Sequence, residues 1–117
     1  MISITNFRKL ALAFEETDEK PHFDRAAFRV KGKIFVTLLE KDKTINLKLS
    51  PENQYVFSKS DPAIYPVAGG WGRMGWTTAD LTKIPAALLK EVLTAAYCQT
   101  APKKLGDKYR TDLDGQA

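Results

Sequence analysis

The sequence is poor in the residues that most often build cross-linked, metal-binding or reactive sites. Its 117 residues include one histidine, His22, and one cysteine, Cys98. A single cysteine excludes an internal disulfide. One histidine among scattered acids supplies too few ligands for a zinc site. We therefore expect no metal or cofactor, an ordinary surface or half-buried histidine, and a cysteine that is a small packed side chain of a helix.

Long apolar runs are also missing. No window of about 18 apolar residues occurs, which excludes a membrane-spanning helix. The first residues lack the basic segment and apolar run of a secretory signal. We therefore expect a cytoplasmic microbial protein without membrane contact. Lys and Arg number 18 against 14 Asp and Glu, and the formal net charge of +4 mildly favours an anionic partner.

Helical periodicity marks three segments of the chain. The first has an apolar stripe at positions 7, 10, 11 and 14, a cap near Ser3 or Thr5, and a break before Pro21. The second begins at residues 50–52, which combine a serine cap, a proline at the first helical position and an acid. The third covers about residues 82–100 and has a wide apolar face, so we expect it to be deeply packed.

Strand periodicity marks the middle of the chain. Residues 25–30, 34–38 and 44–49 alternate in polarity and are separated by short turns, which predicts an antiparallel meander with one buried face. Pro66 places residues 64–67 at a sheet edge, and Trp76 begins a further strand. We expect one α+β domain at residues 1–105, a monomer with an antiparallel sheet of about five strands packed by about three helices. Residues 106–117 are expected to be a polar C-terminal tail with weak order.

A set of short motifs, spread from Phe7 to Leu105, resembles the MmcQ/YjbR family of small bacterial proteins. In chain order they are Phe23, Phe28-Arg29-Val30, Gly32-Lys33-Ile34-Phe35, Leu47-Lys48-Leu49, Gly70-Trp71-Gly72, Gly75-Trp76-Thr77 and Ala101-Pro102-Lys103-Lys104-Leu105. The resemblance implies an α+β fold similar to the double-wing DNA-binding domain of a phage transcription factor. Members are often labelled DNA-binding on that ground, and the family brings no established enzymatic activity or catalytic residues.

The glycine-rich segment at residues 70–75 matches the dinucleotide-binding pattern G-x-G-x-x-G. The context is wrong for that function, because a β-like segment follows it and no βαβ unit surrounds it. Trp76 stands where a phosphate-binding loop needs its lysine. One interpretation is structural: the glycines allow close backbone approach, and Trp71 and Trp76 pack on the sheet or on the last helix. The alternative is an interaction loop anchored by exposed Trp71 and Arg73.

Strand parity predicts a basic outer face of the sheet. The candidate nucleic-acid-binding residues are Arg29, Lys31, Lys33, Phe35 and Lys48, with Lys103 and Lys104 as an extension. Such a surface can hold phosphates and stack a base. An ordinary solvated sheet face is the alternative.

The leading hypothesis for function is therefore a non-catalytic binding protein with double-stranded DNA as its first candidate partner. The second hypothesis is a protein–protein interaction module that uses the glycine-rich segment with Trp71 and Trp76, called the Trp-Gly loop below. A small enzyme is the third. DNA binding requires the basic residues to lie on one continuous face, whereas an adaptor requires exposed aromatic residues.

Overall fold

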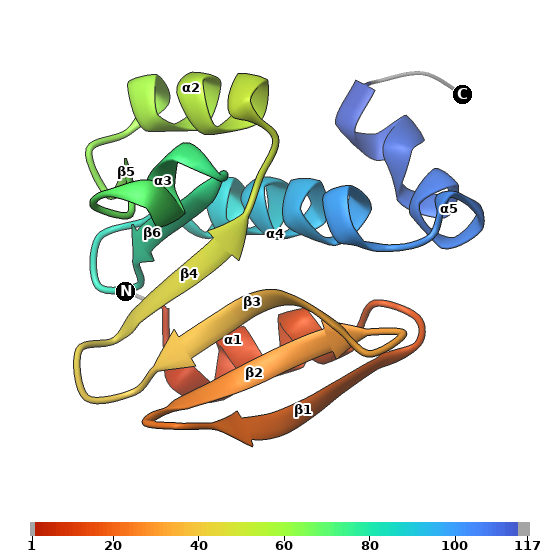
Figure 1. The fold of residues 1–117 in the computed structure, drawn as a ribbon, viewed down its shortest axis with the longest axis horizontal. Coiled ribbons are helices and arrows are strands. Elements are labelled where there is room, and N and C mark those ends of the chain that lie inside the picture. Colours follow the sequence, from red (N-terminus) through yellow and green to blue (C-terminus); the bar gives the residue numbers. More distant parts are fainter. Residues whose placement is uncertain (1, 115–117) are drawn as a thin grey trace.

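The computed structural model describes residues 2–114, the last four by their backbone alone. Six strands form one antiparallel sheet in the order β1-β2-β3-β4-β6-β5 (Figure 1). Their bounds are β1 Thr17–His22, β2 Arg25–Val30, β3 Lys33–Leu39, β4 Thr44–Lys48, β5 Ile64–Pro66 and β6 Trp76–Asp80. The predicted meander is confirmed as β2, β3 and β4, and β5 lies at a sheet edge as Pro66 indicates.

Within the described residues, five helices accompany the sheet. They are α1 Ile4–Leu12, α2 Pro51–Ser60, α3 Gly70–Arg73, α4 Ala86–Thr100 and α5 Lys103–Asp114. The serine caps are confirmed, because the side chains of Ser3 and Ser50 accept hydrogen bonds from backbone N–H groups three residues later. The third predicted helix begins at Ala86 rather than near residue 82, because Pro85 has extended backbone and disfavours helix before it.

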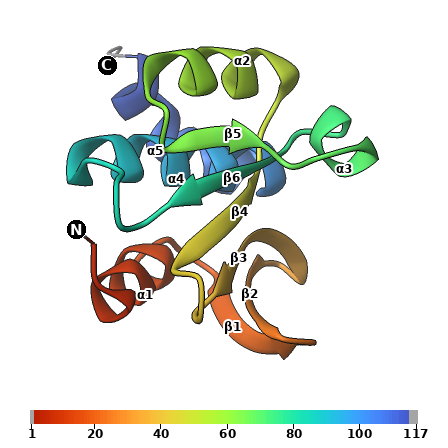
Figure 2. The same cartoon turned by 90° about the vertical axis from the view of Figure 1, so that its left-hand side faces the viewer.

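The core lies between one face of the sheet and the two helices α1 and α4. The rings of Phe7 in α1 and Phe28 in β2 meet edge to face, with centroids 5.3 Å apart. Tyr97 in α4 is fully buried against Phe35 of β3, with centroids 5.6 Å apart. Figure 2 shows α1 on one side of the strands and α3 on the other. The sheet face opposite α1 is called the outer face below.

The strand β1 is absent from the sequence-based prediction, which has five strands where the described residues form six. Its composition is polar and includes Pro21, a pattern typical of a turn. Because β1 is an edge strand paired only with β2, a proline without an N–H group is tolerated there. The register Thr17↔Val30 to His22↔Arg25 makes β1 and β2 a hairpin.

The prediction of a weakly ordered polar tail is wrong for residues 106–114, because these residues belong to α5, which begins at Lys103 and packs on α4. Leu105 and Tyr109 lie four residues apart on one side of this helix and contact the core. The Tyr109 ring lies 5.1 Å from both Phe14 and Tyr97. Residues 115–117 of the expected tail lie outside the described residues.

The expected fold class is confirmed as a single α+β domain, with more helices and strands than predicted. Within residues 2–114, no helix is both long and apolar enough to span a membrane.

Candidate functional site on the outer face of the sheet

The outer face can be traced through the strand register, because paired residues of neighbouring strands lie on the same side of a sheet. One row runs across five strands: Ala27, Thr37, Asn46, Thr78 and Tyr65. Asn46 and Thr78 are joined across this row, since the Thr78 hydroxyl donates to Asn46 Oδ1 at 2.7 Å. Within the described residues no hydrogen bond engages the Asn46 amide N–H groups, so they are available to a ligand.

The placement of Phe35 on the outer face is wrong. The register changes from Phe28↔Val36 to Arg29↔Ile34, which leaves Phe35 as one extra residue in β3. At such a bulge the alternation of side chains reverses. Ile34 therefore joins Thr37 on the outer face, and Phe35 is fully buried, 6.2 Å from the Phe14 ring.

The cations predicted on β2 and β3 do not form one free basic surface. Arg29 Nε lies 3.1 Å from Asp18 Oδ1, and hydrogen bonding to Arg29 lowers the pKa of that carboxyl group. Lys31 lies in the turn after β2, 3.5 Å from Glu16. Lys33 is the register partner of the core residue Val30, so it lies on the other side of β3 from Ile34.

The remaining predicted cations lie in three places. Lys48 is on the outer face, donates to the Met74 carbonyl oxygen and lies 5.8 Å from the centre of the Trp76 ring. Lys103 and Lys104 are in α5, which packs on α4, and Lys103 is paired with Asp107 at 2.8 Å. Arg73 is exposed in α3.

A hollow of about 330 Å³ lies on the outer face and gathers residues that are distant in the sequence. Its lining includes His22 from β1, Arg25 from β2, Asn46 from β4, Trp71 from α3 and Trp76 from β6. Sequence reasoning named both tryptophans but did not select Arg25, and it gave His22 no role. Arg25 lies four residues before Arg29 in β2, so the alternation that places Arg29 on the outer face also places Arg25 there.

Arg25 carries an unmet hydrogen-bonding group. Its Nη1 atom is buried and has no hydrogen-bond partner within the described part of the chain. A guanidinium group has five N–H donors and no acceptor. Leaving a charged donor unpaired is costly. Because Nη1 itself is covered, a ligand in the hollow would meet the other atoms of Arg25 that line it.

The Trp-Gly loop, residues 68–76, is held in place by Gln54 of α2. The Gln54 side-chain amide donates to the carbonyl oxygen of Gly72 at 2.8 Å and to that of Trp76 at 3.3 Å. Trp76 is half-buried at the base of the loop, whereas Trp71 keeps 63% of its surface exposed. The loop thus has a structural basis and also presents one indole ring to solvent.

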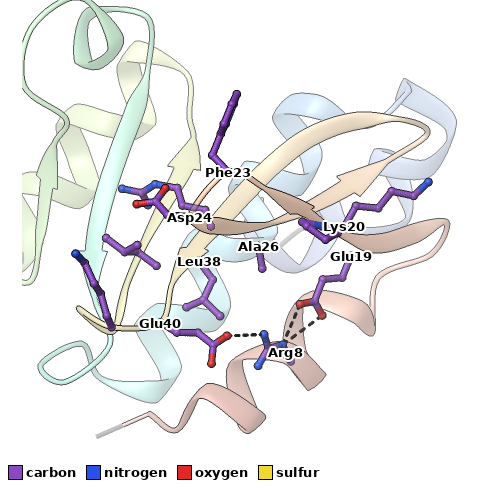
Figure 3. A pocket seen from close by; sticks show the side chains of 12 residues that line it. Arg8, Glu19, Lys20, Phe23, Asp24, Ala26, Leu38 and Glu40 are labelled. Carbon is purple, nitrogen blue, oxygen red and sulfur yellow. Dashed lines mark hydrogen bonds and ion pairs between the residues drawn. The ribbon is translucent and has the colours of Figure 1, made fainter.

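A larger hollow of about 530 Å³ lies beside the β1–β2 turn (Figure 3). Its main cation is already paired: the Arg8 guanidinium donates to Glu19 at 3.1 Å and to Glu40 at 3.1 Å. The hydrogen bonds to these carboxylates, the one to Glu40 first, raise the pKa of Arg8. Arg25 also lines this hollow, together with Lys20 and Lys41, but neither tryptophan does. The larger hollow is therefore the weaker candidate for a ligand that stacks on an indole ring.

The described residues contain no group of three or more His, Cys, Asp and Glu side chains placed to hold a metal ion. The ring of His22 instead contacts Phe23, with centroids 4.9 Å apart. The segment with the G-x-G-x-x-G pattern forms the four-residue α3 between two antiparallel strands, which is not the βαβ context of dinucleotide binding.

A model of the YjbR protein family matches residues 12–99 of the chain. Among solved structures, Deinococcus radiodurans protein DR2400, which carries a DUF419 domain, superposes with a TM-score of 0.76 at 22% identity. That match covers 100% of this chain and 91% of the other. A protein from Pseudomonas syringae superposes with a TM-score of 0.66 at 18% identity, covering 85% of this chain and 99% of the other. At these identities the likeness establishes the fold alone. No curated protein matches.

Proposed function

The chain belongs to the YjbR family, and we propose that it is a non-catalytic nucleic-acid-binding protein whose contact surface is the outer face of the sheet. One observation carries the proposal. A hollow on this face brings together a partly unpaired arginine, Arg25, and two indole rings, Trp71 and Trp76. Cations that follow a phosphate backbone and aromatic rings that stack on bases are the two components of sequence-tolerant nucleic-acid binding.

The charges around the hollow support an anionic ligand. Lys48 already occupies the position over the Trp76 ring where a cationic ligand would bind. Arg73 lies in the same loop as Trp71 and has no ion pair among the described residues. No carboxylate lines the hollow among the described residues, and Asp18, on the same strand as His22, is paired with Arg29. A cationic ligand would therefore be repelled, whereas phosphates would be attracted.

The proposal predicts weak and salt-sensitive binding. Non-specific complexes have dissociation constants of about 10⁻⁴–10⁻⁶ M at physiological salt, and each phosphate contact adds about one unit to the salt slope. The measurement is fluorescence anisotropy of labelled oligonucleotides, single-stranded and duplex, from low to physiological salt. The test variant is Arg25→Gln/Lys48→Gln, in which glutamine keeps hydrogen-bonding capacity without charge.

The matched control is Lys103→Gln/Lys104→Gln. It also removes two positive charges, but it removes them from α5 and leaves the outer face intact. We expect the outer-face variant to lose most of its affinity and up to about two units of salt slope, and the α5 variant to bind nearly as wild type. Absence of binding at low salt would exclude nucleic acid as a ligand. Equal weakening of both variants would show that net charge, and not this face, governs binding.

Protein–protein interaction through the Trp-Gly loop is the second candidate function. Trp71 and Met74 in and beside α3 are 63% and 59% exposed, and large apolar side chains of this kind are common anchors of interfaces. This candidate gains support if the oligonucleotides fail to bind at low salt while Trp71→Ala folds as wild type.

A further inference from the structure

We infer that the hollow on the outer face holds one unpaired nucleotide, with its base against the indole of Trp71 and its phosphate beside Arg25, so that the protein prefers single strands to duplexes. The inference rests on the proposed function and specifies its ligand. It differs from duplex binding through a basic face, which needs no aromatic residue.

The size of the hollow limits its occupant. Sites for small molecules begin at about 300 Å³, and this hollow measures about 330 Å³. One nucleotide is a group of that scale, whereas a duplex presents a wide convex surface that cannot enter. The bases of a duplex are also stacked on each other, so their faces are not available to an indole ring.

The lining of the hollow offers hydrogen-bond donors to the acceptors of a nucleotide. Arg25 lines the hollow, and within the described residues the Asn46 amide makes one hydrogen bond, accepting from Thr78, and its N–H groups make none. Phosphate oxygens and the carbonyl and ring-nitrogen atoms of bases are acceptors. The lining therefore offers donors to the kinds of acceptor that a nucleotide carries.

The position of the two indole rings supports stacking by Trp71 in particular. Trp71 is 63% exposed at the rim, whereas the half-buried Trp76 is already covered in part by Lys48. No ring contact joins the two tryptophans within residues 2–114. A base entering from solvent thus meets an uncovered indole face first.

The test compares three labelled 12-nucleotide probes: a mixed-sequence single strand, the corresponding duplex, and a single strand of abasic sites with the same phosphates and no bases. The variants of the full chain are Trp71→Ala and the control Tyr55→Ala. Tyr55 is a suitable control because it is 65% exposed in α2 and lines a different hollow. Thermal melting checks that both variants remain folded.

We expect wild type to bind the single strand more tightly than the duplex or the abasic strand. Trp71→Ala should weaken single-strand binding roughly 5- to 150-fold, the range of one lost base–aromatic stack. The same variant should leave the duplex and abasic strand unaffected, and Tyr55→Ala should change nothing.

Three results would overturn the inference, and they distinguish failure of the nucleotide site from failure of the proposed function. If the duplex binds as tightly as the single strand, or Trp71→Ala weakens all three probes equally, the nucleotide site is wrong although nucleic-acid binding stands. If no probe binds at low salt, the proposed function itself fails. Arg25→Gln should weaken the binding of the single strand and of the abasic strand to the same extent, because it removes a phosphate contact that both probes share.

Discussion

Four glycines of the Trp-Gly loop differ in their backbone φ and in the space around a Cβ atom. Alanine substitution separates the effects of these two features. Gly70 has a negative φ and an open surrounding, since an added Cβ would lie 3.6 Å from the Arg73 side chain. Gly69 has a φ of +75° and no neighbour within 4 Å. Gly72 lacks positive φ, but an added Cβ would lie 1.8 Å from the carbonyl oxygen of Val67. Gly75 combines a φ of +104° with a Cβ contact of 2.1 Å.

The structure sets the magnitude for each substitution. Backbone strain at positive φ costs about 1–3 kcal/mol for a residue with a Cβ, and forcing extra volume into a packed place costs about 1–3 kcal/mol. Gly70→Ala should therefore be neutral or stabilise by up to about 1 kcal/mol, because alanine is the better helix former. Gly69→Ala and Gly72→Ala should each lose about 1–3 kcal/mol.

Gly75→Ala should lose the sum, about 2–6 kcal/mol. Its Cβ would meet the carbonyl oxygen of Leu49, whose N–H donates to the Gly75 carbonyl oxygen at 3.0 Å. Relieving the contact therefore strains the junction between β4 and β6. The same movement disturbs the hydrogen bond from the Thr77 hydroxyl to the Gly75 carbonyl oxygen.

The assay is equilibrium unfolding in urea, followed by tryptophan fluorescence and circular dichroism on the four single variants. The predicted order of stability is Gly70→Ala, then Gly69→Ala and Gly72→Ala, then Gly75→Ala. A Gly75→Ala variant as stable as Gly70→Ala would refute the reasoning, because it would show that neither positive φ nor the Leu49 contact constrains the loop.

Three further predictions concern the core and the dependence of stability on pH. Phe35→Ala should lose about 3–5 kcal/mol in urea unfolding, as a buried phenylalanine does, whereas a loss below about 1 kcal/mol would return Phe35 to the outer face. Burial raises the pKa of Tyr97 from 10.0 to about 12, so its contribution to stability is complete below pH 10 and is lost as the pH rises from 10 toward 12. The stability advantage of wild type over Tyr97→Phe, which loses a 2.7 Å hydrogen bond to the Glu15 carbonyl oxygen, should then shrink above pH 10; a constant difference up to pH 12 would contradict this. Hydrogen bonding from the Thr82 hydroxyl lowers the pKa of Asp80, so this carboxylate stabilises the fold at neutral pH and ceases to do so as the pH falls below 3.8 through its lowered pKa. Asp80→Asn should flatten the acid limb of the stability profile, and identical acid limbs would argue against the interaction.

Local patterns in the sequence were sufficient for much of the fold. The serine caps, the polarity alternation of residues 25–49 and the apolar face of α4 each depend on residues close in the chain, and each predicted its element. The family motifs added the fold class, which the match over residues 12–99 supports. These features could be predicted because the period of a helix or a strand sets which of the neighbouring side chains are apolar.

The errors came from segments whose role depends on the element with which they pair or pack. A polar segment with Pro21 becomes β1 only because an edge of the sheet accepts it. Residues 103–114 become α5, in which Tyr109 contacts Phe14 and Tyr97. The four-residue spacing of Leu105 and Tyr109 was a local signal of this helix that the prediction did not use.

At the candidate site, the contribution of the sequence can be separated from that of the tertiary structure. The sequence by itself determined which side chains were available: two tryptophans in a glycine-rich segment and basic residues at alternating positions of the predicted strands. The tertiary structure decided which of them meet. The bulge at Phe35 turned a predicted surface ring into the core, because register belongs to a pair of strands and not to one. The hairpin of β1 and β2 and the loop of α3 then brought Arg25 to the same hollow as Trp71, across 46 positions of chain that only folding could close.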